Sequence, residues 1–104
     1  MTFKSYSKTA SKTAIYPDYV KLLYPLLGLS GEVGEVMNKI KKHYRDDVPL
    51  DKGDLKKELG DILWYLNAVC KDLNIDFEDM AQSNLDKLLD RKKRGVIGGS
   101  GDER

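Results

Sequence analysis

Apolar side chains recur along most of the chain at spacings of three and four residues, the period of one face of an α-helix. The clearest stripe runs through residues 51–73 and consists of Leu55, Leu59, Ile62, Leu63, Leu66, Val69, Cys70 and Leu73. No run rich in Val, Ile or Thr alternates with the period of a β-strand. The pattern therefore predicts an all-α fold.

Helix-capping and helix-breaking residues divide this pattern into four predicted helices. These span residues 3–14, 18–44, 51–73 and 76–94. Thr2, Asp51 and Asp76 are suited to cap helix N-termini, because their side-chain oxygens can accept hydrogen bonds from free backbone N–H groups. Pro25 is expected either to kink the second helix or to split off its first turns.

Short loops join the predicted helices, which is typical of a four-helix-bundle-like domain. We assign residues 1–94 to one such domain and residues 95–104 to a glycine-rich tail. The tail is expected either to fray in solvent or to fold over bound phosphates. A chain of 104 residues has little core of its own. We therefore expect its helix faces to be buried in a homodimer or homotetramer.

Composition argues against several classes of protein. The 18 basic and 17 acidic residues nearly cancel, so no basic excess indicates a nucleic-acid polymer as partner. No apolar run approaches the roughly 20 residues that span a membrane, and the N-terminal residues lack the apolar stretch of a secretory signal. The single cysteine, Cys70, cannot form an internal disulfide, so we expect a cytoplasmic protein in which Cys70 belongs to the core. The single histidine, His43, cannot by itself make a zinc site of the usual type.

Two pairs of acidic residues are placed so that their side chains can converge. Glu32 and Glu35 lie three residues apart in the second predicted helix, and Glu58 and Asp61 have the same spacing in the third. Residues three apart share a helix face. At about 100° per residue, both pairs fall on the same rotational side of their apolar stripes. Packing of the two helices would then bring four carboxylates together.

Such a group of carboxylates would be costly without cations, because like charges repel and are hard to desolvate. Mg²⁺ prefers oxygen ligands and commonly completes its octahedron with water and substrate phosphates. The pattern thus favours a magnesium site over acids on a solvated face, although the second interpretation stays open. Gly28, Gly31 and Gly34 flank the first pair. Each costs up to ~1 kcal/mol in a helix interior relative to alanine, which suggests close approach of another helix or of a ligand.

Residues 28–36 and 57–66 together resemble the E-x-x-E…E-x-x-D signature of MazG-like nucleoside triphosphate pyrophosphohydrolases, an all-α superfamily. The resemblance extends from about Tyr24 to Arg94. Relatives include dimeric dUTP and dCTP pyrophosphatases and the phosphoribosyl-ATP pyrophosphohydrolase of histidine synthesis. Many members carry a further glutamate before the first motif, where this chain has Gly31. The departure bears on the number of metals and on how the attacking water is oriented.

The resemblance implies a reaction in which water attacks the α-phosphorus of a nucleoside triphosphate, with a deoxyribonucleotide favoured, and pyrophosphate leaves. It implies that Glu32, Glu35, Glu58 and Asp61 bind Mg²⁺, for which Mn²⁺ can substitute. Glu35 or Glu32 would accept the proton of the attacking water, and the sequence does not choose between them.

The same resemblance implies a set of substrate-binding residues. Family members carry an asparagine, a lysine and an arginine in the last helix, matched here by Asn84, Lys87 and Arg91. Lys39 is a further candidate near the acidic residues, and Trp64 or Tyr65 could stack on a base, although Trp64 could equally be core. Two alternatives stay open: an enzyme acting on phosphoribosyl-ATP, and a non-catalytic helical partner protein whose acids are only surface.

Overall fold

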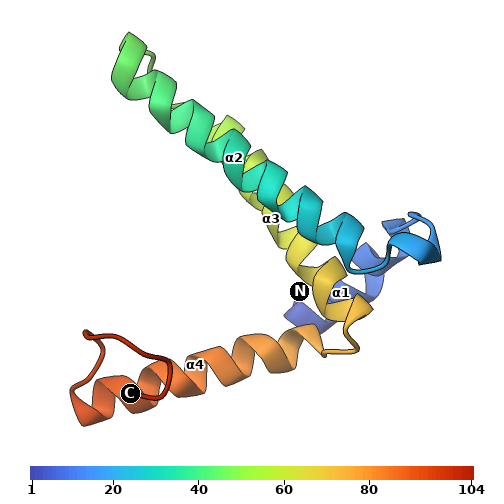
Figure 1. Cartoon of the computed structure of the whole chain (residues 1–104), viewed down its shortest axis with the longest axis vertical. Coiled ribbons are helices and arrows are strands. Elements are labelled where there is room, and N and C mark those ends of the chain that lie inside the picture. The colour runs from blue at the N-terminus through green and yellow to red at the C-terminus, as the bar shows by residue number, and fades with distance from the viewer.

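The computed structural model describes residues 1–104 and contains helices and no strands. The all-α prediction is confirmed. Four α-helices and two short 3₁₀ helices follow one another along the chain (Figure 1). They are α1 (Phe3–Ala10), η1 (Ser11–Thr13), η2 (Asp18–Val20), α2 (Leu23–Asp46), α3 (Lys52–Asp72) and α4 (Phe77–Arg94).

The N-terminal boundaries differ most from those predicted. The first helix ends at Ala10 and tightens into η1, and the second begins at Leu23 rather than at residue 18. Pro25 lies in the first turn of α2, where its missing N–H has no intrahelical acceptor to lose. Of the two expectations for Pro25, the loss of the first turns is therefore correct, since residues 18–20 form the separate η2.

Each N-cap predicted from the sequence forms. The Thr2 hydroxyl accepts a 3.0 Å hydrogen bond from the N–H of Ser5. Asp51 accepts from the N–H groups of Gly53 and Asp54, at 2.9 and 3.2 Å. Asp76 accepts from the N–H of Asp79 at 2.8 Å. These contacts fix where α1, α3 and α4 begin.

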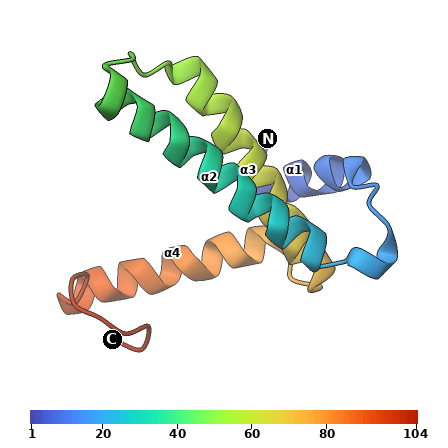
Figure 2. The same cartoon turned by 45° about the horizontal axis from the view of Figure 1, so that its top comes forward.

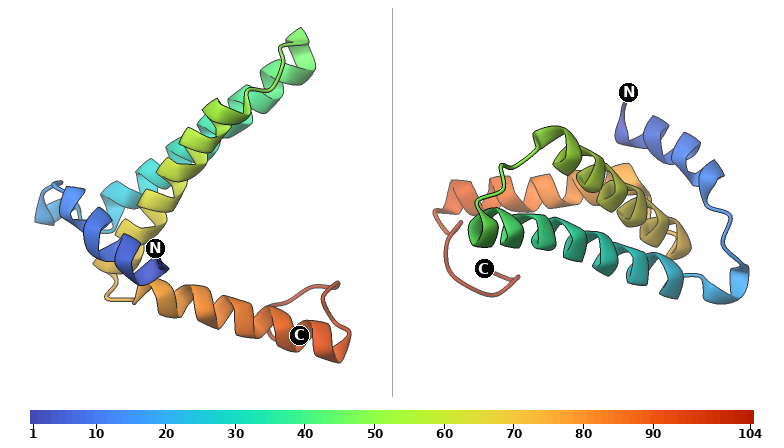
Figure 3. Two further views of the ribbon diagram at one scale, coloured as in Figure 1. Left: turned by 180° about the vertical axis from the view of Figure 1, so that it is seen from behind. Right: turned by 90° about the horizontal axis from the view of Figure 1, so that it is seen from above.

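Helices α2 and α3 form an antiparallel hairpin that carries both acidic motifs (Figures 1 and 2). Helix α4 leaves the end of α3 and runs away from the hairpin at a wide angle (Figure 3). Helix α1 lies across the junction of α3 and α4 and contacts both. A single chain is thus an open arrangement of helices rather than a closed bundle.

The core is small and lies at this junction. Ala68, Cys70 and Phe77 are its buried apolar residues. The rings of Phe3 and Tyr6 pack on Phe77, with centroids 5.4 and 6.1 Å away. The expectation that Cys70 is core is confirmed, and burial raises the pKa of its thiol.

Much of the apolar surface predicted to be buried is exposed in the single chain. The exposed residues include Leu26, Val33, Met37 and Tyr44 of α2, Leu59 of α3, and Leu85, Leu88 and Leu89 of α4. No helix in the structure combines the length and apolar character needed to cross a membrane.

Candidate metal centre and substrate cleft

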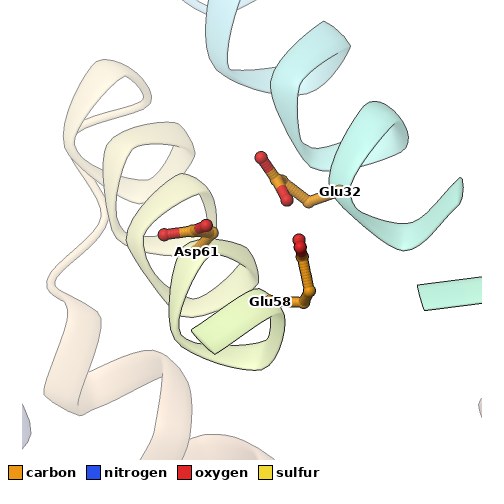
Figure 4. A group of neighbouring side chains, drawn as sticks. All are labelled: Glu32, Glu58 and Asp61. Atoms are coloured by element: carbon orange, nitrogen blue, oxygen red, sulfur yellow. The ribbon is translucent and has the colours of Figure 1, made fainter. Parts of the chain in front are cut away.

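The hairpin brings three acidic side chains together. Glu32 comes from α2, and Glu58 and Asp61 come from the facing turns of α3. One carboxylate oxygen from each lies within 4.8 Å of the others (Figure 4). Glu32 and Glu58 are partly buried between the helices, whereas Asp61 is exposed at the edge. This arrangement follows from the three-residue spacing of Glu58 and Asp61, which lets both side chains reach Glu32 across the antiparallel hairpin.

The electrostatics of this acidic group favour a bound cation. A hydrogen bond with Glu58 is the largest cause that raises the pKa of Glu32, followed by burial and the charges of Asp61, Glu58 and Glu35. Burial and the charges of neighbouring carboxylates disfavour the ionised form of Glu32. A hard divalent ion supplies positive charge, and carboxylate oxygens are the donors that Mg²⁺ prefers. The residues present therefore fit the metal that the sequence implied.

Glu35 is not part of the acidic group. It lies three residues beyond Glu32, is exposed, and affects Glu32 through its charge alone. Three of the four expected ligands thus converge, and the role of Glu35 stays a prediction.

Lys39 provides a positive charge next to this group. Its ammonium pairs across the hairpin with Asp54 and lies 3.8 Å from Glu58. The bond to Asp54 is the main cause that raises the pKa of Lys39, and it lowers the pKa of Asp54. Lys39 therefore pairs with acids of α3 across the hairpin.

An open cleft of about 450 Å³ lies beside the acidic group, lined by Thr13, Glu32, Asp61, Trp64 and Tyr65. Trp64 borders the cleft rather than the core and is partly exposed. Its indole N–H donates a 2.7 Å hydrogen bond to the hydroxyl of Thr13. The rings of Trp64 and Tyr65 meet edge to face, 5.1 Å apart at 88°. Two aromatic faces and two carboxylates thus share one cleft.

Thr13 was not expected from the sequence. It comes from η1, and its partner Trp64 lies 51 positions away. No periodic signal in the polar segment around it indicates this contact.

Side-chain hydrogen bonds hold the N-terminal segment against α3. The buried Asn67 accepts from the hydroxyl of Ser7 at 2.5 Å and donates to that of Ser11 at 3.2 Å. Further along, Asp72 accepts from the Tyr16 hydroxyl at 2.7 Å and from the N–H of Leu22 at 2.8 Å. These bonds flank Thr13 in sequence and so fix the wall of the cleft that it forms.

Gly28, Gly31 and Gly34 were expected to allow close approach of another helix or of a ligand. In the single chain only one of the three positions does so. A Cβ at Gly28 would lie 2.1 Å from Cε1 of Tyr65, so a glycine is needed for α3 to approach. Gly31 and Gly34 have no neighbouring atom within 4 Å of a Cβ. Close approach is therefore confirmed for Gly28 alone.

The predicted residues of the last helix lie elsewhere. Asn84 and Lys87 border a separate hollow on α4, and neither they nor Arg91 line the cleft beside the acidic group. Lys87 and Arg91 instead bind Asp102 of the C-terminal tail. The tail folds back along α4 rather than fraying. In the single chain, α4 leads these residues away from the hairpin (Figure 1).

Comparison with known proteins agrees with the resemblance noted in the sequence. The family model of the MazG nucleotide pyrophosphohydrolase domain matches residues 23–96, which include all three acidic side chains and all of α4. The Gene 37 protein of Mycobacterium phage L5 is 44% identical, across 95% of this chain and 96% of that protein. No solved structure is significantly similar. The chain therefore belongs to the MazG nucleotide pyrophosphohydrolase family.

Proposed function

We propose that the chain is a magnesium-dependent pyrophosphohydrolase that converts a nucleoside triphosphate, with a deoxyribonucleotide favoured, to the monophosphate and pyrophosphate. The observation that carries the proposal is the acidic group of Glu32, Glu58 and Asp61, whose oxygens lie within 4.8 Å of one another beside a cleft. Membership of the family supports a nucleotide substrate. We also propose that it acts in the cytoplasm, in keeping with its unpaired Cys70.

The acidic group would hold Mg²⁺, or Mn²⁺ in its place, through Glu32, Glu58 and Asp61. The bound metal would polarise the α-phosphoryl group and stabilise the charge of the leaving pyrophosphate. Glu35 lies next to this group with an exposed carboxylate, which leaves it available to accept the proton of the attacking water. Glu32 is the alternative base.

The nucleoside end of the substrate would lie in the cleft. Trp64 and Tyr65 present aromatic faces on which a base can stack. The bond from Trp64 to Thr13 fixes the indole, so the ring does not have to be ordered when the nucleotide binds. Lys39, whose ammonium lies 3.8 Å from Glu58, would contact a phosphate oxygen there.

The phosphate end would be bound by Asn84, Lys87 and Arg91, with the arginine able to form two parallel hydrogen bonds to a phosphate. We propose that α4 of a second copy brings these residues to the cleft in a homodimer or homotetramer. The exposed apolar residues of α4, Leu85, Leu88 and Leu89, support this proposal. Val33, Met37 and Leu59 of the hairpin offer a matching apolar surface. A sedimentation mass near 11.8 kDa at micromolar concentration would contradict the assembly.

A panel of ribo- and deoxyribonucleotides, with phosphoribosyl-ATP included, tests the proposed reaction. Each substrate is incubated with Mg²⁺ or Mn²⁺, and pyrophosphate and orthophosphate are measured separately. The proposal expects pyrophosphate together with a nucleoside monophosphate, and no activity in chelator. Turnover of phosphoribosyl-ATP alone would favour the histidine-pathway alternative. Orthophosphate as the only product, or no turnover of any substrate, would contradict the proposed reaction.

A further inference from the structure

The cationic pair Lys87 and Arg91 is already occupied within the chain. Oδ1 of Asp102 lies 2.9 Å from Nζ of Lys87 and 3.1 Å from Nη2 of Arg91. The same Arg91 nitrogen also donates to the backbone carbonyl of Asp102 at 2.5 Å. The side chain of Arg91 is 7% exposed, compared with 75% for that of Asp102. One carboxylate oxygen therefore bridges two cations, one of which is nearly desolvated.

The backbone conformation of the tail brings the Asp102 carboxylate back to α4. Helix α4 ends at Gly95, which has a left-handed φ of 73°, and Gly99 and Gly101 adopt φ of 100° and 86°, which favour glycine. The guanidinium of Arg104 then closes the loop by donating to four backbone carbonyls, those of Val96, Ile97, Gly98 and Gly101. The tail thus returns along α4 as a loop closed at its own end (Figure 3).

The bridging carboxylate occupies the donors that a phosphate oxygen would take. Ionised oxygens of both kinds accept short, charge-assisted hydrogen bonds from lysine and arginine. The hydrogen bonds from Lys87 and then from Arg91 lower the pKa of Asp102, which keeps this carboxylate ionised near neutral pH. A phosphoanhydride carries more negative charge than one carboxylate and offers Arg91 two oxygens, so it can displace the tail.

We propose that Asp102 is an internal competitor for phosphate groups at Lys87 and Arg91, so that the tail opens when a phosphoanhydride binds and closes when it leaves. The proposal rests on the function proposed above for these two residues. It gives the tail a role in releasing the product pyrophosphate, because the carboxylate takes over the donors as the product departs.

The competition is expected to be modest. The apparent affinity of a ligand is its intrinsic affinity multiplied by the fraction of molecules that are competent to bind it. Ion pairs of an exposed carboxylate shift such an equilibrium by about two- to tenfold. Asp102 therefore weakens phosphate binding without preventing it.

Calorimetric titration of the full chain with inorganic pyrophosphate tests the competition without requiring turnover. The tail variant is Asp102→Asn, and the matched control is Glu103→Gln, a neighbouring acid that makes no ion pair or side-chain hydrogen bond in the structure. Asp102→Asn should tighten pyrophosphate binding by about two- to tenfold, and Glu103→Gln should change it little. Equal changes of pyrophosphate affinity in both variants would mean that only the overall charge matters, and would overturn the proposal.

A second measurement follows the tail itself. Backbone ¹⁵N relaxation at Gly99 and Gly101 should show low order parameters once pyrophosphate is bound, as expected for a released loop. Unchanged order parameters at saturating pyrophosphate, or no binding of pyrophosphate to wild type and Asp102→Asn alike, would overturn the proposal. Neither result bears on the nucleotide panel, so failure of the tail mechanism and failure of the proposed reaction remain distinguishable.

Discussion

The ring of Tyr65 occupies the space that a side chain at position 28 would need, since a Cβ at Gly28 would lie 2.1 Å from its Cε1 atom. Gly28 precedes Glu32 by four residues on α2, and Tyr65 follows Asp61 by four on α3. This contact therefore lies about one turn from the acidic group on both helices. It sets how closely the two helices approach beside the candidate metal centre.

Gly28→Ala should destabilise the protein in spite of the better helix propensity of alanine. The gain of up to ~1 kcal/mol from propensity is opposed by an overpacked contact that costs about 1–3 kcal/mol, because the Tyr65 ring must move. Gly31→Ala is the matched control, since a Cβ there meets no atom within 4 Å. Urea unfolding of both variants measures the difference. A Gly28→Ala protein as stable as Gly31→Ala would show that the helices adjust freely.

Thr13→Val should weaken nucleotide binding, because it removes the acceptor that orients the indole of Trp64. The expected loss is about 0.5–1.5 kcal/mol, the net contribution of one hydrogen bond. Trp64 is the only tryptophan of the chain, so its fluorescence reports on the cleft without interference. Thr9→Val is the control, because Thr9 is an exposed residue of α1 that does not line the cleft. Equal nucleotide binding constants for the two variants would show that Thr13 does not contribute to nucleotide binding.

The pH dependence of stability should reveal the Tyr16–Asp72 contact. Burial, and then the hydrogen bond to Asp72, raise the pKa of Tyr16 above its ordinary value of 10.0. The folded state therefore binds the proton of the Tyr16 hydroxyl more tightly than the unfolded state does. The contribution of this hydroxyl to stability is complete below pH 10 and is lost as the pH rises further. Melting temperatures between neutral pH and pH 11 should fall less steeply for Tyr16→Phe than for wild type. Parallel curves would mean that this hydroxyl does not contribute.

Arg91→Ala should raise the activation free energy for turnover of triphosphates by about 2–4 kcal/mol. This is the scale for losing one partner of a desolvated charge pair. Diphosphates should be poor substrates and should lose less, because part of the contacted group is absent. Lys92 is an exposed neighbour, so Lys92→Ala should change the activation free energy with either substrate by under ~0.5 kcal/mol. Steady-state rates for the three proteins with both substrates make the comparison. Small and equal losses on both substrates would place Arg91 outside the phosphate site.

The acidic group was predictable because it depends on helix periodicity. The apolar stripes of α2 and α3 determine which faces pack, and the three-residue spacing of Glu58 and Asp61 lets both reach Glu32, whereas the same spacing in the first motif did not bring Glu35 into the group. The helix starts were predictable for a related reason, since Thr2, Asp51 and Asp76 act on backbone groups within three residues.

Features that depend on irregular backbone were not predictable. Leu22 adopts a φ of 66° immediately before α2, and no local signal indicates that Asp72, 50 positions away, binds its N–H. Thr13 reaches the cleft through the same N-terminal segment. The direction of α4 and the contact of Asp102 with Arg91 depend on the turns before and after that helix, which carry no hydrophobic period.

Isosteric replacement of the acidic ligands tests the central claim most directly. Glu58→Gln and Asp61→Asn each remove one negative charge without changing the size of the side chain. Their controls are Glu78→Gln in the first turn of α4 and Asp47→Asn at the left-handed C-cap of α2, where asparagine is readily accommodated. Pyrophosphate release from a deoxynucleoside triphosphate is measured with saturating Mg²⁺, and circular dichroism verifies the helical content. Turnover should fall by at least about 100-fold in both ligand variants and remain near the wild-type rate in both controls. Turnover of Glu58→Gln and Asp61→Asn within about twofold of wild type would contradict a metal centre formed by these carboxylates.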